Sequence, residues 1–157
     1  MMQNFNDWLA TVPESITRDP LWKMKVYRLA LFLGDLAWHD VTKLASDHRT
    51  VSLADQLFRA VGSIGANIAE GYSRQSGRDR ARFYEYALGS ARESRHWYYE
   101  GRHVLADRVT EHRINLLAEL ARMLLAIIPQ ERTRNLAEEQ ASYKIDLPAL
   151  LDSPPMP

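Results

Sequence analysis

The sequence contains no cysteine, which excludes disulfide bridges, a thiolate nucleophile and cysteine-ligated metal sites. It also carries no net charge, because 20 Lys and Arg residues balance 20 Asp and Glu residues, and this argues against strong, indiscriminate binding to nucleic acid. No apolar run approaches the ~20 residues needed to cross a bilayer, and residues 1–12 show no signal peptide. From these absences we expect a cytoplasmic protein without a membrane partner.

Glycine and proline are sparse between residues 21 and 128, so long helices can form there without interruption. Apolar residues recur in this region at the spacings i, i+3, i+4 and i+7, which is the pattern of helices with one buried face. Capping residues predict where four helices begin: at Asp19-Pro20, near Ser52, at Ser76 and at Asp107. Gly71 and Pro129 are predicted to end the second and fourth helices, and the third is expected to reach Leu105.

The predicted fold is all-α, an antiparallel up-and-down four-helix bundle with short N- and C-terminal extensions, because helices joined by short connections pack as neighbours. We assign residues 1–18 to an N-terminal extension, 19–129 to the bundle and 130–157 to a C-terminal tail. The tail is expected to be partly helical within 133–142 and disordered from Ser153 onward, since its end is rich in proline. The inner face of the third helix is predicted to consist of Tyr84, Ala87, Leu88, Ala91, Ser94, Tyr98, Gly101 and Leu105.

Small and polar residues gather at the end of the second predicted helix, where the chain reads Ser-Ile-Gly-Ala-Asn-Ile-Ala-Glu-Gly over residues 63–71. Asp-Gln-Leu-Phe-Arg-Ala precedes this run at 55–60, and Phe83, Gly89-Ser90 and Glu93 follow it. The order and spacing of these residues resemble the bacterial four-helix-bundle proteins encoded in intervening sequences of 23S rRNA genes. Relatives of that family include the accessory variability proteins of diversity-generating retroelements. The resemblance covers residues 21–128.

The resemblance implies a bundle that assembles into a ring-like homopentamer. For the retroelement relatives it also implies binding to nucleic acid and to a reverse transcriptase. The candidate partners are therefore further copies of this chain, RNA or DNA, and a reverse transcriptase or other protein. Two departures from the family are Gly65, where proline is often found, and the zero net charge, since the retroelement relatives are strongly basic. The second departure favours the less characterised branch, which has no established biochemical role.

Small residues on the second and third predicted helices indicate close packing of helices, within or between subunits. They are Gly62, Gly65, Ala66, Gly89, Ser90 and Ala91. A mid-helix glycine costs about 1 kcal/mol relative to alanine, which is tolerated where it lets another group come close. Polar residues near the same faces are predicted to form a structural polar seam in which Glu93 meets Arg59. The members of this predicted seam are Arg59, Asn67, Glu70 and Glu93.

Arginines cluster around the predicted start of the third helix, within a region, residues 59–113, that carries 10 basic and 7 acidic residues. Free N–H groups and the helix dipole at such a position favour anions, and the arginine fork suits phosphate. Tyr72, Phe83 and Tyr84 lie nearby in the sequence and are able to stack on bases. The candidate nucleic-acid-binding residues are Arg74, Arg78, Arg80 and Arg82. The alternative is a solvated, partly ion-paired surface.

Enzyme interpretations have weaker support. Glu93-x-x-His96 and Glu100-x-x-His103 are similar to the motif of di-iron bundles, but both copies lie on one helix where that site needs two. Arginine and histidine pairs are also spaced too closely for a helical ribonuclease. We therefore expect no catalytic residue, no metal and no cofactor. The favoured function is a non-enzymatic oligomeric bundle with accessory nucleic-acid binding, and the main alternative is a protein-binding scaffold without nucleic-acid affinity. A metal-dependent bundle enzyme or a ribonuclease comes third.

Overall fold

A computed structural model of the chain describes residues 4–132 and 145–157, and every structural statement below concerns those residues. They form helices and connections, with no strand among them. In chain order the helices are α1 (Phe5–Leu9), α2 (Glu14–Thr17), the 3₁₀ helix η1 (Pro20–Lys23), α3 (Lys25–Ala45), α4 (Val51–Tyr72), α5 (Gly77–Glu100), α6 (Arg102–Leu105), α7 (Asp107–Arg132) and α8 (Leu147–Asp152). None of these helices is both long and apolar enough to cross a membrane.

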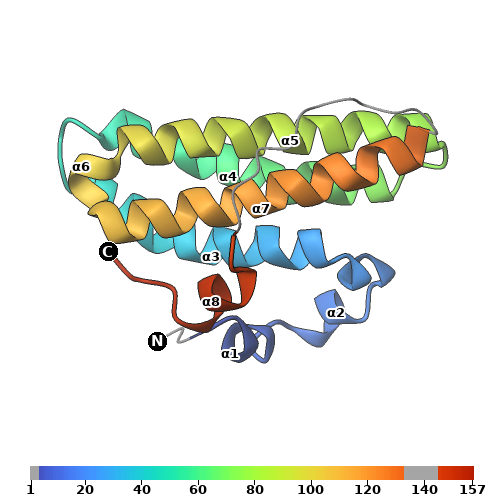
Figure 1. Cartoon of the computed structure of the whole chain (residues 1–157), viewed down its shortest axis with the longest axis horizontal. Helices are drawn as coiled ribbons and strands as arrows, with labels where there is room; N and C mark the ends of the chain where they lie inside the picture. Colours follow the sequence, from blue (N-terminus) through green and yellow to red (C-terminus); the bar gives the residue numbers. More distant parts are fainter. Residues whose placement is uncertain (1–3, 133–144) are drawn as a thin grey trace.

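The long helices α3, α4, α5 and α7 contain 21, 22, 24 and 26 residues and lie side by side (Figure 1). α4 packs against both α3 and α5, α5 packs against α7, and α7 returns to α3. Because the connections between them are short, each helix runs antiparallel to the one before it. The all-α bundle predicted from the sequence is confirmed.

Apolar side chains from the long helices meet in one core. Every residue predicted on the inner face of the third helix is buried, because 3.6 residues per turn bring every third or fourth side chain to the same face. Tyr84 is one of these buried residues. Burial, with a smaller contribution from the nearby carboxylate of Glu131, raises the pKa of the Tyr84 hydroxyl to about 12.

Four predicted helix boundaries are wrong, the first two being the start of the first long helix and the end of the third. Asp19 does cap a turn, since its carboxylate accepts a hydrogen bond from the Leu21 N–H (2.8 Å), but this turn is η1. The backbone is extended at Met24 and the helix α3 begins only after it. At the other end of the bundle, α5 stops at Glu100, and after Gly101 the separate short helix α6 runs from Arg102 to Leu105.

Gly71 does not end α4 as predicted. It lies inside the helix, and the chain continues through Tyr72 before the helix stops. A Cβ atom built on Gly71 would lie 2.8 Å from Tyr84 Cε1 and 2.9 Å from Phe83 Cβ, which is too close for carbon atoms. The residue is therefore glycine because α5 approaches α4 closely at this point.

Pro129 also lies inside a helix rather than at its end, since α7 continues to Arg132. Proline removes one backbone hydrogen bond and disfavours a helical interior. Ion pairs to α5 hold the last turn in place despite this cost. Glu131 accepts a hydrogen bond from Arg80 Nε (2.7 Å), and Arg132 Nη2 donates to Glu85 (2.9 Å).

The N-terminal extension packs on the side of α3 that faces away from α5 (Figure 1). Phe5 and Trp8 of α1 are buried, and their rings make edge contacts with Phe32 of α3 at centroid distances of 5.1 and 5.4 Å. Trp8 Nε1 also donates a hydrogen bond to Asp35 (2.6 Å). Helix α1 thus completes the core on this side.

The C-terminal segment, defined here as residues 145–157, packs beside α1 and against α7. Leu147 and Pro154 are buried, and the Pro155 carbonyl accepts a hydrogen bond from Arg113 of α7 (2.8 Å). A buried side chain of the bundle therefore contacts the backbone of the residues from Ser153 onward, for which the sequence predicts disorder. The helical turn predicted within 133–142 lies outside the described residues.

Candidate functional site

The four arginines predicted to bind nucleic acid lie at the connection between α4 and α5 and in the first turns of α5. Ser76 caps α5 as predicted, since its hydroxyl accepts a hydrogen bond from the Asp79 N–H (3.1 Å). Carboxylates partner most of these arginines: Arg74 with Glu70, Arg80 with Glu131 (2.7 Å) and Arg82 with Asp79 (3.4 Å). Arg78 is exposed and has no partner among the residues that the structure describes.

Arg80 makes structural contacts within the fold. Besides its ion pair with α7, it donates to the backbone carbonyls of Arg74 (3.1 Å) and Gln75 (2.8 Å), and so it closes the turn. Two of the three aromatic residues expected to stack on bases already make contacts within the chain. Tyr84 is buried, and the Phe83 ring lies beneath the guanidinium of Arg74 at 4.7 Å. A partly ion-paired surface therefore describes most of this region.

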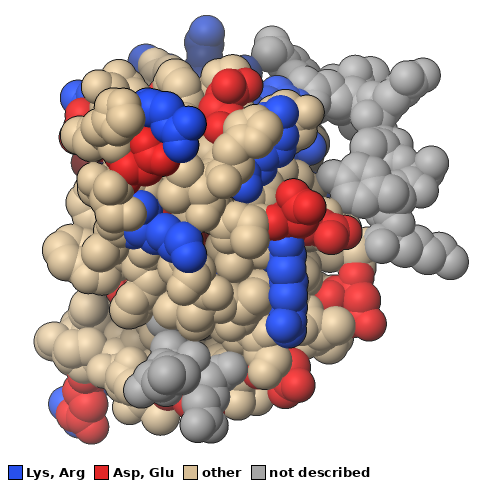
Figure 2. Space-filling model, turned by 90° about the vertical axis from the view of Figure 1, so that its left-hand side faces the viewer, with Lys and Arg blue, Asp and Glu red and all other residues tan. Residues whose placement is uncertain are grey.

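The opposite end of the bundle carries a similar mixture of charge. Basic and acidic side chains lie interspersed over the face seen in Figure 2. Asp47 and Arg49, in the connection between α3 and α4, form an ion pair there at 2.6 Å. This hydrogen-bonded arginine lowers the pKa of Asp47. Mixed charge of this kind does not build the one-signed surface that attracts a polyanion.

The structure does not bring the predicted polar seam together. Arg59 is exposed and pairs with Asp55 one turn before it (3.0 Å), while Glu93 accepts a hydrogen bond from Trp97 Nε1 (3.2 Å). No contact joins Arg59 to Glu93 within the described part of the chain, because each finds a neighbour on its own helix. Asn67 likewise bonds within α4, to the carbonyl and hydroxyl oxygens of Ser63 (2.9 and 3.0 Å). Glu70 pairs with Arg74.

The first Glu-x-x-His motif, Glu93 to His96 in α5, also makes local contacts. Both Glu93 and His96 are exposed, and the His96 ring packs against Trp97 at a centroid distance of 4.8 Å. The described residues contain no group of three or more His, Asp or Glu side chains placed to hold a metal ion.

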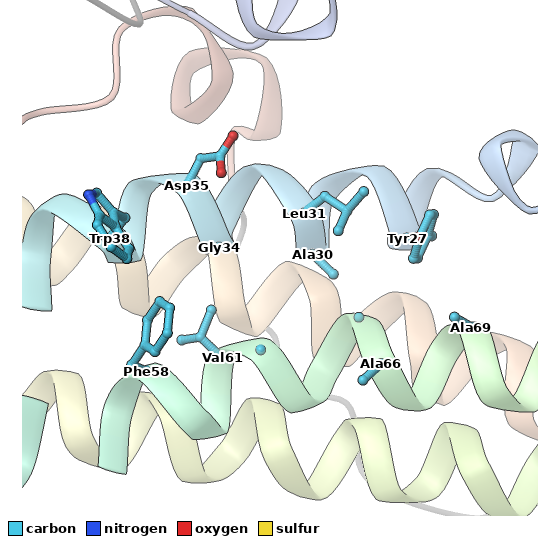
Figure 3. Close-up of a pocket in the computed structure, with 12 residues that line it drawn as sticks. Tyr27, Ala30, Leu31, Gly34, Asp35, Trp38, Phe58, Val61, Ala66 and Ala69 are labelled. Atoms are coloured by element: carbon cyan, nitrogen blue, oxygen red, sulfur yellow. The ribbon is translucent and has the colours of Figure 1, made fainter. Parts of the chain in front are cut away.

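An apolar groove runs along the outside of the bundle between α3 and α4, with a volume of about 380 Å³ (Figure 3). Trp38 of α3 and Phe58 of α4 lie close together at one end, with ring centroids 5.9 Å apart, and are 60% and 44% exposed. The lining along α4 continues with Val61, Gly62, Gly65, Ala66 and Ala69. Exposed aromatic rings beside small residues mark a surface that a second protein surface can cover.

Packing within the chain does not account for the glycines of this groove. A Cβ atom built on Gly34 or Gly62 meets nothing within 4 Å, and one on Gly65 lies 3.8 Å from its nearest neighbours, an ordinary contact. Alanine would fit at all three positions and favour the helix by up to about 1 kcal/mol. Gly71 is thus needed inside the subunit, whereas the groove glycines leave space that the single chain does not use.

A charged cluster lies inside the bundle where α3, α5 and α7 meet. Asp40 and Arg113 are fully buried and pair through two hydrogen bonds, from Nε to Oδ2 (2.7 Å) and from Nη2 to Oδ1 (3.1 Å). The Tyr98 hydroxyl donates to the same carboxylate at 2.8 Å. Burial, together with the nearby Asp40, raises the pKa of Tyr98 well above its usual value, so the hydroxyl keeps its proton. These bonds compensate for removing the two charges from water.

His112 connects this cluster to the C-terminal segment. Its Nδ1 atom lies 2.9 Å from Arg113 Nη1, and because a guanidinium can only donate, Nδ1 accepts. The ring proton therefore lies on Nε2, which donates to the Leu150 carbonyl (2.6 Å). Burial lowers the pKa of His112 to about 4, so the ring is neutral at pH 7.

The sequence prediction missed this cluster, although the sequence contains a signal for it. Asp40 follows Leu36 at the i+4 position of an apolar stripe, and Arg113 stands midway between Val109 and Leu117, four residues from each. A charged residue on a buried face needs a partner of opposite charge. The first and last long helices of an antiparallel bundle are neighbours, so these two charges were available to each other.

Comparison with known proteins supports the resemblance. The family model described as 23S rRNA-intervening sequence protein matches residues 22–126. A 1.70 Å crystal structure of a protein with unknown function from the S23 ribosomal protein family, from Bacteroides thetaiotaomicron, matches with a TM-score of 0.62 and 25% sequence identity. That match covers 66% of this chain and 97% of the other. No curated protein matches this chain.

Proposed function

The chain belongs to the family of 23S rRNA-intervening sequence proteins, and from this premise we propose that it is a non-enzymatic module that assembles with further copies of itself through the groove between α3 and α4. The expected assembly is a homopentamer, as the family resemblance implies. The similar crystal structure is of a protein with unknown function, so the proposal depends on the groove rather than on a relative's activity.

The observation that carries the proposal is the unused space above Gly34 and Gly62. Glycine inside a helix weakens it, and the single chain gains no closer contact in return. A helix of a second copy laid along the groove would approach the α3 backbone at Gly34 and the α4 backbone at Gly62. It would also cover Trp38 and Phe58, and aromatic side chains are enriched in such interfaces.

Glycine-to-alanine substitutions test this proposal, because assembly and monomer stability respond in opposite directions. Gly62→Ala should stabilise the isolated chain by up to about 1 kcal/mol and weaken assembly, because the added methyl group occupies the interface. Gly89→Ala is the matched control, since its Cβ also meets nothing within 4 Å but it lies outside the groove. Trp38→Ala should weaken assembly as well, whereas Tyr86→Ala, an exposed aromatic outside the groove, should not.

Sedimentation velocity and light scattering measure the outcome, and a homopentamer has five times the 18.1 kDa mass of one chain. The proposal is refuted if the wild-type chain stays monomeric at high micromolar concentration. It also fails if Gly62→Ala and Trp38→Ala both assemble as tightly as their control variants.

Binding of nucleic acid is the second candidate, and Arg78 is the observation that favours it. It is exposed near the start of a 24-residue helix, with the half-exposed Arg82 one turn further on. Replacing both with alanine should abolish RNA binding in a low-salt filter assay without changing assembly. Arg59→Ala, an exposed arginine on α4, is the control. If the wild-type chain retains no RNA even at low salt, a protein-binding scaffold is the function that remains, and a reverse transcriptase loses its support as a partner.

A further inference from the structure

The C-terminal segment lies outside the region that the family model matches, yet buried side chains of α7 hold its backbone. We propose that His112 and Arg113 form a docking site for a peptide whose helical turn ends in consecutive prolines. The segment 145–157 of the same chain is the resident ligand, and a peptide of the same chemistry displaces it. This inference does not depend on self-assembly.

The prolines explain why this segment presents free carbonyl groups. In a continued helix, the carbonyl of Leu150 would accept from the N–H of residue 154, but Pro154 has no N–H. Consecutive prolines also stop the helix, so the carbonyl of Pro155 has no helical partner. His112 Nε2 donates to the first carbonyl at 2.6 Å, and Arg113 Nη2 donates to the second at 2.8 Å.

The donors of the site are held in position by the bundle itself. Arg113 is fully buried and keeps its two bonds to Asp40 whether or not a peptide is present, because those bonds use Nε and one N–H of Nη2. The Tyr98 hydroxyl also donates to the Asp40 carboxylate, at Oδ2. His112 in turn is oriented by its contact with Arg113 Nη1. A site whose donors are oriented in advance loses little entropy when a ligand binds.

The resident segment has little stability of its own. α8 contains six residues, which is too few for an isolated helix in water. Its order therefore depends on docking, through the two carbonyls and the buried side chains of Leu147 and Pro154. Segments with few buried contacts open locally while the rest of a protein stays folded. Each opening presents the His112 and Arg113 donors to a competing peptide.

A labelled full-length chain tests the exchange directly. Because the chain has no cysteine, Ser153→Cys places one fluorophore on an exposed position of the C-terminal segment. A synthetic peptide of residues 145–157 should displace this segment and lower the label's anisotropy. The peptide must reach roughly millimolar concentration, because a tethered ligand competes at an effective concentration of that order. The same peptide with Pro154→Ala and Pro155→Ala should be at least about tenfold weaker, since its helix can continue and occupy its own carbonyls.

Substitutions at His112 provide the second readout. His112→Leu removes the donor to Leu150 and should lower the anisotropy without peptide. His112→Gln retains an N–H donor and an acceptor, and it should keep the segment docked. Equal displacement by both peptides, no displacement at several millimolar, or an unchanged anisotropy in a folded His112→Leu variant would overturn the proposal. If His112→Leu does not fold, the peptide competition on the otherwise wild-type chain decides it.

Discussion

Replacing Gly71 with alanine should destabilise the bundle, although alanine is the better helix former. The added Cβ would lie 2.8 Å from Tyr84 Cε1 and 2.9 Å from Phe83 Cβ, whereas carbon atoms in contact prefer about 3.5–4.0 Å. Tyr84 is buried, and the Cβ of Phe83 cannot rotate away from its backbone, so α5 itself must shift. Overpacking of this kind costs about 1–3 kcal/mol, and the gain in helix propensity offsets at most about 1 kcal/mol. We expect a net loss of about 1–2 kcal/mol.

Gly89→Ala is the control for this prediction, because a Cβ built there meets nothing within 4 Å. It should gain about 0.5–1 kcal/mol, so the two variants should differ by about 1.5–3 kcal/mol. Urea unfolding followed by circular dichroism measures this difference. With a slope of about 2 kcal/mol per molar urea, the midpoints should lie about 0.75–1.5 M apart. A Gly71→Ala midpoint at or above that of the wild-type chain would refute the packing argument.

Two further predictions concern the buried cluster. Asp40→Asn should cost about 3–5 kcal/mol in urea unfolding, because it leaves the charge of Arg113 buried without a counter-charge, whereas Asp55→Asn, in an exposed pair, should change stability by less than about 1 kcal/mol. Equal effects would contradict the burial argument. His112 has its pKa lowered by burial from 6.5 to about 4, so between these values the unfolded chain binds the additional proton. The neutral His112 ring therefore contributes to the free energy of unfolding above pH 6.5. This contribution is lost as the pH falls to about 4, by about 3 kcal/mol in all. Unfolding titrations against pH should show a shallower slope in His112→Gln, and an unchanged slope would reject the assignment.

The family and the arrangement of the helices could be predicted from the sequence because both depend on local patterns. Helical spacing identified the buried face of α5, including Tyr84 and Tyr98, without knowledge of the partner helices. The cap at Ser76 was also predictable, since it involves residues three apart. The contacts of the candidate site were harder to predict from the sequence. Arg74, Arg80 and Arg82 were correctly placed near one turn, and a partly ion-paired surface was one of the two predictions. The identity of the acidic partners was not predicted, and the partner of Arg80 comes from a distant helix.

The sequence alone therefore determined the helices, the faces they bury and the family, because each follows from residues within a few turns of one another. The tertiary structure decided what the ambiguous residues do. Glycine at 71 and glycine at 62 look alike in the sequence, but only the first has another helix against it. Pro129 remains inside α7, and the C-terminal segment lies against the bundle, because side chains from elsewhere in the fold contact them. Such contacts join residues far apart in the chain, and the local pattern of a sequence does not specify which distant groups will meet.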